Sequence, residues 1–482
     1  MPHSRSKRSL PGGEHTFQMT EKLNLVNPKL VPPLDEGFSP AVLAERAFRK
    51  DVADSGRGVP LVLAIGREDG SISRYETYVY PEDHSRATAN LQYAERIFKF
   101  LLWQRGGWRA YIGGPKAIYE HIKRSYAQGG ERGFDYRFVK EVYNRPLEVV
   151  NCAPSDAPPA RESGSQLGRH LDGCRIGFDL GASDVKVAAV IDGKPVFSEE
   201  IIWEPSRQVN PDYHYRMITS ALRKAAAKLP HVDAIGGSSA GVYVDNKVRV
   251  ASLFRSVPAE RYDEVRNLFL RIRDEMGAPL VIVNDGEVAA LAGSMSLNKN
   301  GVLGIALGSS EAAGYVNMEG NITGWLNELA FAPIDYSPNA PIDEWSGDRG
   351  CGASYLSQQG VFRLAETIGT ELPEDMTNAE WLKFVQGKLA AGDERAVKIW
   401  RSIGIYVGYA IAHYADFYEL RHVLLLGRVT SGEGGALIIE WASKVLRSEF
   451  RDLASRIEIH LPDERSRRVG QAVAAASLPT TI

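Results

Sequence analysis

The sequence predicts an α/β protein whose central strands are largely parallel. Short apolar runs typical of buried strands, such as residues 280–283 and 422–426, alternate with segments of helical periodicity. Residues 176–191 add a strand, a turn of small residues and a returning strand, and the hairpin dipeptide Asp192-Gly193 follows. The chain of 482 residues is long enough for two or three domains.

The composition excludes several classes of protein. Hydrophobic residues make up 44% of the chain and charged residues 24%, which is ordinary for a soluble globular protein. The net charge of -3 provides no basic field for nucleic acid or an anionic membrane. No apolar run approaches the ~20 residues that span a bilayer. Three scattered cysteines fit a reducing cytosol, so we expect a cytoplasmic protein. The basic residues 1–10 lack a following apolar segment, which predicts a disordered tail and no signal peptide.

Residues 1–150 predict an extra N-terminal α/β domain of unknown role. Helices are expected at residues 39–52, 89–104, 115–126 and 138–143, and strands at 59–66, 74–80, 108–112 and 147–150. Residues 151–173 lose this periodicity and contain three prolines, which indicates a linker or a long surface loop. The order hairpin, helix, strand occurs in residues 61–114 and again in 176–237. The domain is therefore either a degenerate relative of the second segment or a convergent unit.

From Cys174 onward strands again alternate with helices. Helices are expected at residues 213–228 and 259–276, and strands at 233–237, 242–252, 280–283, 302–316, 422–426 and 457–460. Beyond residue 379 the remaining segments are mostly helical. The charged run 463–468 predicts a solvated helix start with its acidic residues in the first turn.

The turn after the first core strand carries the clearest chemical signal. Asp179 ends the strand, and small residues up to Ser183 follow before Lys186. Such a turn lets backbone N–H groups approach a phosphate, while the aspartate holds a metal ion or its water. The alternative is a plain hairpin with a capping aspartate.

Four motifs stand in a fixed order and together resemble one protein family. They are Asp179–Lys186, Asn284–Gly293, Leu307–Gly314 and Leu424–Gly427. The set resembles the ROK (repressor, ORF, kinase) family of sugar kinases and regulators, and the resemblance covers residues 175–478. It implies an actin-like ATPase (ribonuclease H-like) two-lobed fold, with lobes at residues 174–286 and 287–482, preceded by the additional N-terminal α/β domain.

The resemblance also implies an ATP site with Mg²⁺, for which Asp179 would serve the metal shell. Small residues in the two phosphate loops and a glycine in the nucleotide-base loop would contact the nucleotide. The implied ATP-binding residues are Asp179, Gly181, Ser183, Lys186, Gly308, Ser309, Ser310 and Gly427.

Asp285 is the implied catalytic base, which would take the proton from a sugar hydroxyl. The implied sugar-binding residues are Asn284, Glu328, Ser239 and Gly241. An Asn-Asp helix N-cap is the alternative interpretation of residues 284–285, and the sequence supports it equally well.

Several positions depart from the family pattern. Glu311 stands in the second phosphate loop, where a carboxylate repels polyphosphate unless it points away or pairs with a base. Phe331 replaces a histidine that binds sugar and zinc in the family, and could favour a deoxy or N-acyl sugar. Ala353 replaces the last sugar-binding glutamate. Of the zinc knuckle only Gly347, Gly350 and Cys351 survive, so we expect no zinc.

The sequence therefore predicts an ATP-dependent sugar kinase-like protein that phosphorylates a hydroxyl of a hexose or related sugar. The alternative is a catalytically impaired sugar or nucleotide sensor, or a ROK-type transcriptional regulator. The α/β character of the first domain and the mildly acidic charge make nucleic acid an unexpected partner. The family suggests a homodimer, and no membrane association is expected.

Overall fold

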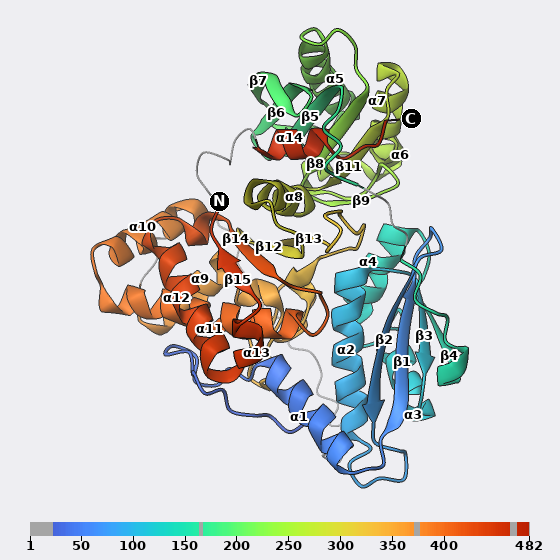
Figure 1. Cartoon of the computed structure of the whole chain (residues 1–482), viewed down its shortest axis with the longest axis vertical. Coiled ribbons are helices and arrows are strands. Elements are labelled where there is room, and N and C mark those ends of the chain that lie inside the picture. Colours follow the sequence, from blue (N-terminus) through green and yellow to red (C-terminus); the bar gives the residue numbers. More distant parts are fainter. Residues whose placement is uncertain (1–22, 163–166, 371–375, 463–469, 482) are drawn as a thin grey trace, which may run out of the picture.

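The computed structural model describes residues 23–162, 167–370, 376–462 and 470–481 (Figure 1). The basic segment 1–10 and the charged run 463–468 lie outside these residues. Within the described ranges, no helix is both long enough and apolar enough to cross a membrane. The chain forms an N-terminal domain, a first lobe (residues 174–284) and a second lobe (residues 298–462), with two helices between the lobes.

The N-terminal domain contains a four-stranded sheet in the order β2-β1-β3-β4. Its helices are α1 (Ala41–Asp54), α2 (Ala89–Arg105), α3 (Lys116–Ser125) and α4 (Gly133–Tyr143), and its strands are β1 (Val59–Gly66), β2 (Ile72–Val79), β3 (Arg109–Gly113) and β4 (Glu148–Cys152). β1 pairs with β3 in the antiparallel sense, whereas the corresponding pair in the first lobe, β5 and β8, is parallel. This difference favours a convergent unit over a degenerate relative.

The predicted linker between the N-terminal domain and the lobes partly belongs to the domain. β4 continues to Cys152, and Arg161 forms a two-way backbone pairing with Ile72 at the start of β2. The domain also shares one continuous hydrophobic core with the second lobe, in which Trp103 of α2 packs against Phe331 at a ring-centroid distance of 4.5 Å. The N-terminal domain therefore packs directly against the second lobe, because apolar side chains of both parts are buried together.

The first lobe is built on a five-stranded sheet in the order β11-β8-β5-β6-β7. Its strands are β5 (Cys174–Leu180), β6 (Asp184–Ile191), β7 (Lys194–Ile202), β8 (Ala234–Ser239) and β11 (Leu280–Asn284), with a small hairpin of β9 (Val242–Val244) and β10 (Lys247–Val250). Its helices are α5 (Pro211–Ala226), α6 (Tyr262–Arg266) and α7 (Leu268–Met276). β5, β8 and β11 are parallel, so their carboxyl ends meet at one edge. Every residue of β5 is buried, as expected for a strand covered on both faces.

The second lobe contains a four-stranded sheet in the order β13-β12-β14-β15 and a group of helices beside it (Figure 1). Its strands are β12 (Val302–Leu307), β13 (Glu311–Val316), β14 (His422–Leu426) and β15 (Glu458–His460). Its helices are α9 (Gln358–Thr367), α10 (Asn378–Ala390), α11 (Glu394–Tyr414), α12 (Glu433–Glu449) and α13 (Arg451–Ala454).

Two helices, α8 (Asp285–Leu297) and α14 (Gly470–Ala476), lie between the two sheets. Gly314 of β13 allows α8 to approach, since a Cβ atom there would lie 2.2 Å from the carbonyl oxygen of Gly286. α14 packs as closely on β5, where a Cβ atom on Gly177 would lie 1.8 Å from the carbonyl oxygen of Ala472. The C-terminal helix thus returns to the first sheet, so the expected lobe boundary of 287–482 does not hold for its residues.

Candidate active site

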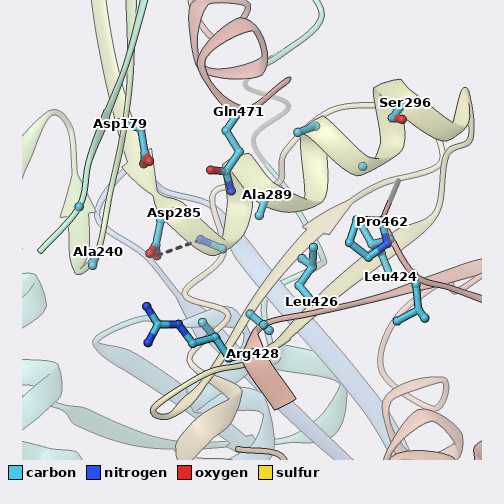
Figure 2. Close-up of a pocket in the computed structure, with 18 of the residues that line it drawn as sticks. Asp179, Ala240, Asp285, Ala289, Ser296, Leu424, Leu426, Arg428, Pro462 and Gln471 are labelled. Carbon is cyan, nitrogen blue, oxygen red and sulfur yellow. Dashed lines mark hydrogen bonds between the residues drawn. The ribbon is translucent and has the colours of Figure 1, made fainter. Parts of the chain in front are cut away.

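A cavity of about 680 Å³ lies between the lobes, at the carboxyl ends of the parallel strands (Figure 2). This edge of an α/β sheet is where ligands usually bind, because the strands end there and loops of both sides diverge. The cavity is lined by residues of β5, α8, β12, β13, β14 and α14, and by residues that directly follow β5, β8 and β14. They include Asp179, Leu180, Gly181, Ala182, Ala240, Asp285, Ala289, Ala292, Leu424, Leu426, Gly427, Arg428, Pro462 and Gln471.

Asp179 and Asp285 face the same end of this cavity (Figure 2). Ser238 donates a hydrogen bond of 2.7 Å to Asp179, whose pKa is raised because burial outweighs this bond and the attraction of Lys186. The pKa of Asp285 is raised to about 6 by burial and by the charge of Asp179. Two carboxylates that destabilise each other's charge form a site that a cation would stabilise.

The first phosphate loop reaches the cavity only in part. Gly181 lines it, but Ser183 donates to Asp184 at 3.0 Å and is exposed. The ammonium of Lys186 lies 3.2 Å from Asp184 and 3.8 Å from Asp179. Ser183 and Lys186 therefore lie beside the cavity without lining it.

The predicted second phosphate loop lies at the tip of the β12–β13 hairpin. Gly308, Ser309 and Ser310 are not among the cavity-lining residues, and both serines are exposed. Gly427 does line the cavity, with a φ of 91°. A Cβ atom there would lie 2.4 Å from the carbonyl oxygen of Leu307, so only glycine fits this close approach.

The other end of the cavity is apolar. Ala289 of α8 lies on one side, and Leu424, Leu426 and Pro462 lie on the other (Figure 2). Ala292, one turn further along α8, also lines the cavity. Arg428, which the sequence analysis did not select, lines the cavity between these regions. Its guanidinium points toward the end that holds Asp285, and it forms no ion pair within the described part of the chain. The only sequence signal for Arg428 is its place directly after the motif glycine.

A second, smaller cavity of about 40 Å³ is lined by Asn284, the residue before Asp285. Three of the predicted sugar-binding residues, Gly241, Asn284 and Glu328, line it. The fourth, Ser239, is buried and accepts a 2.7 Å hydrogen bond from Tyr243, which does line it. The structure thus brings these residues to one place. It adds Tyr143, Trp325 and Glu287, which sequence reasoning missed.

Asn284 forms the N-cap of helix α8, the alternative that the sequence left open. Its Oδ1 accepts a 2.7 Å hydrogen bond from the amide of Gly286, and its Nδ2 donates to the carbonyl of Gly241 at 2.8 Å. Both polar atoms are used within the protein. Asp285 follows as the first helical residue. One of its carboxylate oxygens accepts a 3.0 Å hydrogen bond from the amide of Gly286, and the side chain lines the large cavity.

Carboxyl groups surround the small cavity. Burial raises the pKa of Glu287 to about 8, and the neighbouring amide of Asn327 only partly offsets this rise. Glu287 Oε1 is buried without a hydrogen-bond partner. The pKa of Glu328 is raised to about 7 by burial and by Asp285. Polar groups that lack partners favour a ligand rich in hydroxyl donors.

The arrangement of the lobes matches a known fold. A ROK hexokinase from Thermus thermophilus aligns with 63% of this chain and 97% of its own, at 16% sequence identity and a TM-score of 0.50. The chain has the ROK fold. A ROK family glucokinase from Streptomyces griseus, solved with glucose and AMPPNP, aligns with 63% of this chain and 99% of its own (21% identity, TM-score 0.45). A ROK family transcriptional regulator, described as a homologue of the E. coli MLC protein, aligns with 64% of this chain and 78% of its own (18% identity, TM-score 0.49). No protein-family model and no curated protein matches the sequence.

On this ROK fold, Glu311 points into the core and away from the cavity. It is 3% exposed and accepts a 3.0 Å hydrogen bond from the hydroxyl of Tyr414. Burial raises the pKa of Glu311 to about 8, so the group is largely neutral at pH 7. The predicted repulsion of polyphosphate by Glu311 therefore does not arise.

Phe331 and the segment around Asp348 and Cys351 contact the N-terminal domain. The ring of Phe331 packs against Trp103 and Phe134 and is not among the residues lining either cavity, so a role in sugar specificity is not supported. Ala353 is buried in the short turn Gly352–Ser354. Burial raises the pKa of the Cys351 thiol to about 12, as for an inert core cysteine.

Proposed function

We propose that the protein is an ATP- and Mg²⁺-dependent kinase of the ROK type, which transfers the γ-phosphoryl group to a hydroxyl of a sugar. The position of Asp285 carries the proposal. Its side chain lines the large cavity, and its charge raises the pKa of Glu328 in the small one. A group at this junction is placed to act on a reaction between a donor in one cavity and an acceptor in the other.

The large cavity has the chemistry of a nucleotide site. Its apolar end, with Ala289, Ala292 and Leu424, suits a flat aromatic base, and its volume of about 680 Å³ is typical of a small-molecule pocket. Between this end and the aspartates, Arg428 directs its guanidinium toward the aspartate end and offers a cation for phosphate oxygens. Gly181 and Gly427 allow backbone approach there. The base and phosphate regions are therefore separated along the cavity as they are along ATP.

The aspartates fit a magnesium ion held with the nucleotide. Mg²⁺ prefers oxygen ligands, and sites of this kind use one or two carboxylates together with substrate phosphates. Asp179 provides such oxygens, and burial raises the pKa of both Asp179 and Asp285, to which the charge of Asp179 adds for Asp285. When bound, Mg²⁺ would neutralise charge on the phosphates.

Asp285 would accept the proton of the attacking hydroxyl. Its pKa of about 6 leaves it ionised at pH 7, yet basic enough to accept a proton as the hydroxyl attacks. Asn284 holds it in place through the N-cap bonds to Gly286 and Gly241. The helix that follows has small residues on its cavity side and leaves room for the donor.

The small cavity suits a polyhydroxylated acceptor because it combines carboxyl groups with the rings of Tyr243 and Trp325. One water molecule needs roughly 10–15 Å³ of cavity volume, so the small cavity of about 40 Å³ holds only a few waters. A hexose requires that the wall formed by Tyr143 and residues 324–326 moves outward. We therefore propose that acceptor entry is coupled to movement of this wall.

The closed acceptor cavity also supports a second candidate, a sugar or nucleotide sensor or ROK-type regulator without turnover. In that case ligand entry would change the contact between Tyr143 and the lobes without phosphoryl transfer. Mg·ATP consumption across sugars and polyols, measured beside ligand-induced shifts in melting temperature, separates the two. Turnover supports the kinase, and shifts without turnover support the sensor. The expected homodimer and cytoplasmic location stay predictions, and light scattering of the purified protein tests the former.

A further inference from the structure

We propose that His422, Glu458 and His460 bind a divalent metal ion of the zinc class. The three residues lie on β14 and β15, neighbouring parallel strands in which His422 is paired with Glu458 and Leu424 with His460. None of the three residues lines the large cavity, although Leu424, the strand partner of His460, does.

The geometry of the three potential ligand atoms matches one face of a tetrahedron. His422 Nδ1 lies 3.1 Å from His460 Nε2 and 3.4 Å from Glu458 Oε2, and the last two atoms are 3.5 Å apart. Zn–N and Zn–O bonds of about 2.0–2.1 Å in tetrahedral geometry place neighbouring ligand atoms about 3.3–3.4 Å apart. The observed triangle therefore accommodates such an ion with small shifts, and water can occupy the fourth position.

The ligand types also fit. Two imidazoles and one carboxylate form a donor set that protein zinc sites use with one position open to solvent. Glu458 supplies the negative charge of the set, which offsets the positive charges of Lys299 and Arg421 near His422. The side chain of Glu458 is 64% exposed, so an ion can enter from solvent.

Metal binding would stabilise the short edge strand β15. This strand has three residues and pairs only with β14. It leads directly into Leu461 and Pro462, which line the large cavity. A metal that joins β15 to His422 would hold this wall in position without contacting the nucleotide site.

The sequence-based expectation of no zinc concerned the segment around Cys351. The present site uses other residues, and 35 positions of sequence separate His422 from Glu458, so no local motif indicates it. Only the pairing of β14 with β15 brings the ligands together.

The test is a metal titration of the chelator-treated full chain. Zn²⁺ is titrated against a chromophoric chelator, and Co²⁺ is used as a probe whose visible absorption reports tetrahedral coordination. We expect one ion per chain and a higher melting temperature with Zn²⁺. Glu458→Gln and His460→Ala should each weaken zinc binding by at least about tenfold, since even residues that only orient metal ligands contribute that much to metal affinity. Glu458 is exposed, so its replacement should not affect folding.

His231→Ala is the control variant, since His231 belongs with Cys174 and Asp233 to the other group of potential metal ligands among the described residues, and its Nε2 lies 3.2 Å from Asp233. It should leave zinc binding unchanged. The proposal is overturned if the chelator-treated protein binds no Zn²⁺, if Glu458→Gln and His460→Ala bind as the wild type does, or if only His231→Ala loses the ion. In the first case the 3.1 Å contact between the imidazoles is an ordinary hydrogen bond.

Discussion

Arg96 of helix α2 donates a 2.9 Å hydrogen bond to Asp348 of the second lobe, in a contact where both side chains are buried. Lys99 and Arg132 reach the same carboxylate at 2.9 and 2.8 Å. Burial alone would raise the pKa of Asp348, but the three cations, Arg96 foremost, lower it well below its usual range. The N-terminal domain is therefore tied to the lobe through a buried ionic network as well as an apolar core.

Replacing Asp348 by alanine should cost ~3–5 kcal/mol of unfolding free energy, because three buried cations lose a common partner. Urea denaturation measures this loss. Glu344→Ala, at an exposed position in the same loop, is the control and should change stability by less than about 0.5 kcal/mol. Equal stability of Asp348→Ala and the wild type would show that the network does not hold the domains together.

Most secondary structure could be predicted from the sequence, because local patterns determine it. Strand β1 and strand β14 have the predicted bounds, and α2 differs by one residue. The expected helix over residues 259–276 is instead broken at Asn267 into short pieces. Its periodicity continues across the break, so no signal in the pattern marks it.

The site was predictable where function depends on residues close in sequence. Asp179, Gly181, Asp285 and Gly427 all line the large cavity, and the motifs that contain them are short. Tyr143 could not be found, because it lies in another domain and reaches the small cavity only through tertiary packing. The orientation of Glu311 could not be predicted either, since it depends on Tyr414, which is 103 residues away.

The pH dependence of kcat/KM should show an acidic limb with an apparent pKa of about 6. The base must be ionised, so activity falls as pH decreases below the raised pKa of Asp285 in the free enzyme. Rates at subsaturating sugar from pH 4.5 to 8 measure the limb. A limb near the ordinary aspartate value of about 4 would contradict the environment described for Asp285.

Glu311→Gln should flatten the dependence of stability on pH. The pKa of Glu311 in the folded state, about 8, exceeds its unfolded value, so its contribution is full at low pH and is lost as pH rises toward 8. This loss amounts to at most ~1.4 kcal/mol per pH unit. Thermal melts at pH 5–8 measure it, with the exposed Glu319→Gln as control. The stability of Glu311→Gln should still decrease with rising pH, because the pKa values of Glu45 and Glu287 are also raised to about 8. Identical slopes in the wild type and Glu311→Gln would refute the buried, protonated state.

Trp325→Ala should favour larger acceptors. The indole lines the small cavity, donates a 3.1 Å hydrogen bond to Glu162 and lies under the guanidinium of Arg105 at 3.3 Å. Its removal enlarges the cavity, so kcat/KM for a bulky sugar relative to a small polyol should rise about tenfold or more. Trp345→Ala, at a tryptophan that is 73% exposed, should leave the ratio unchanged. An unchanged ratio in both variants would mean that this wall does not limit acceptor size.

Asp285→Asn tests the central claim most directly. The variant keeps the size of the side chain but cannot accept the hydroxyl proton. Mg·ATP-dependent phosphorylation of the best sugar from a panel should therefore fall by about 10²-fold or more, while the ATP-induced shift in melting temperature persists. Phosphorylation at the wild-type rate in Asp285→Asn would contradict the role of Asp285 as the base. Absence of phosphorylation by the wild type with every sugar tested would contradict the kinase function itself.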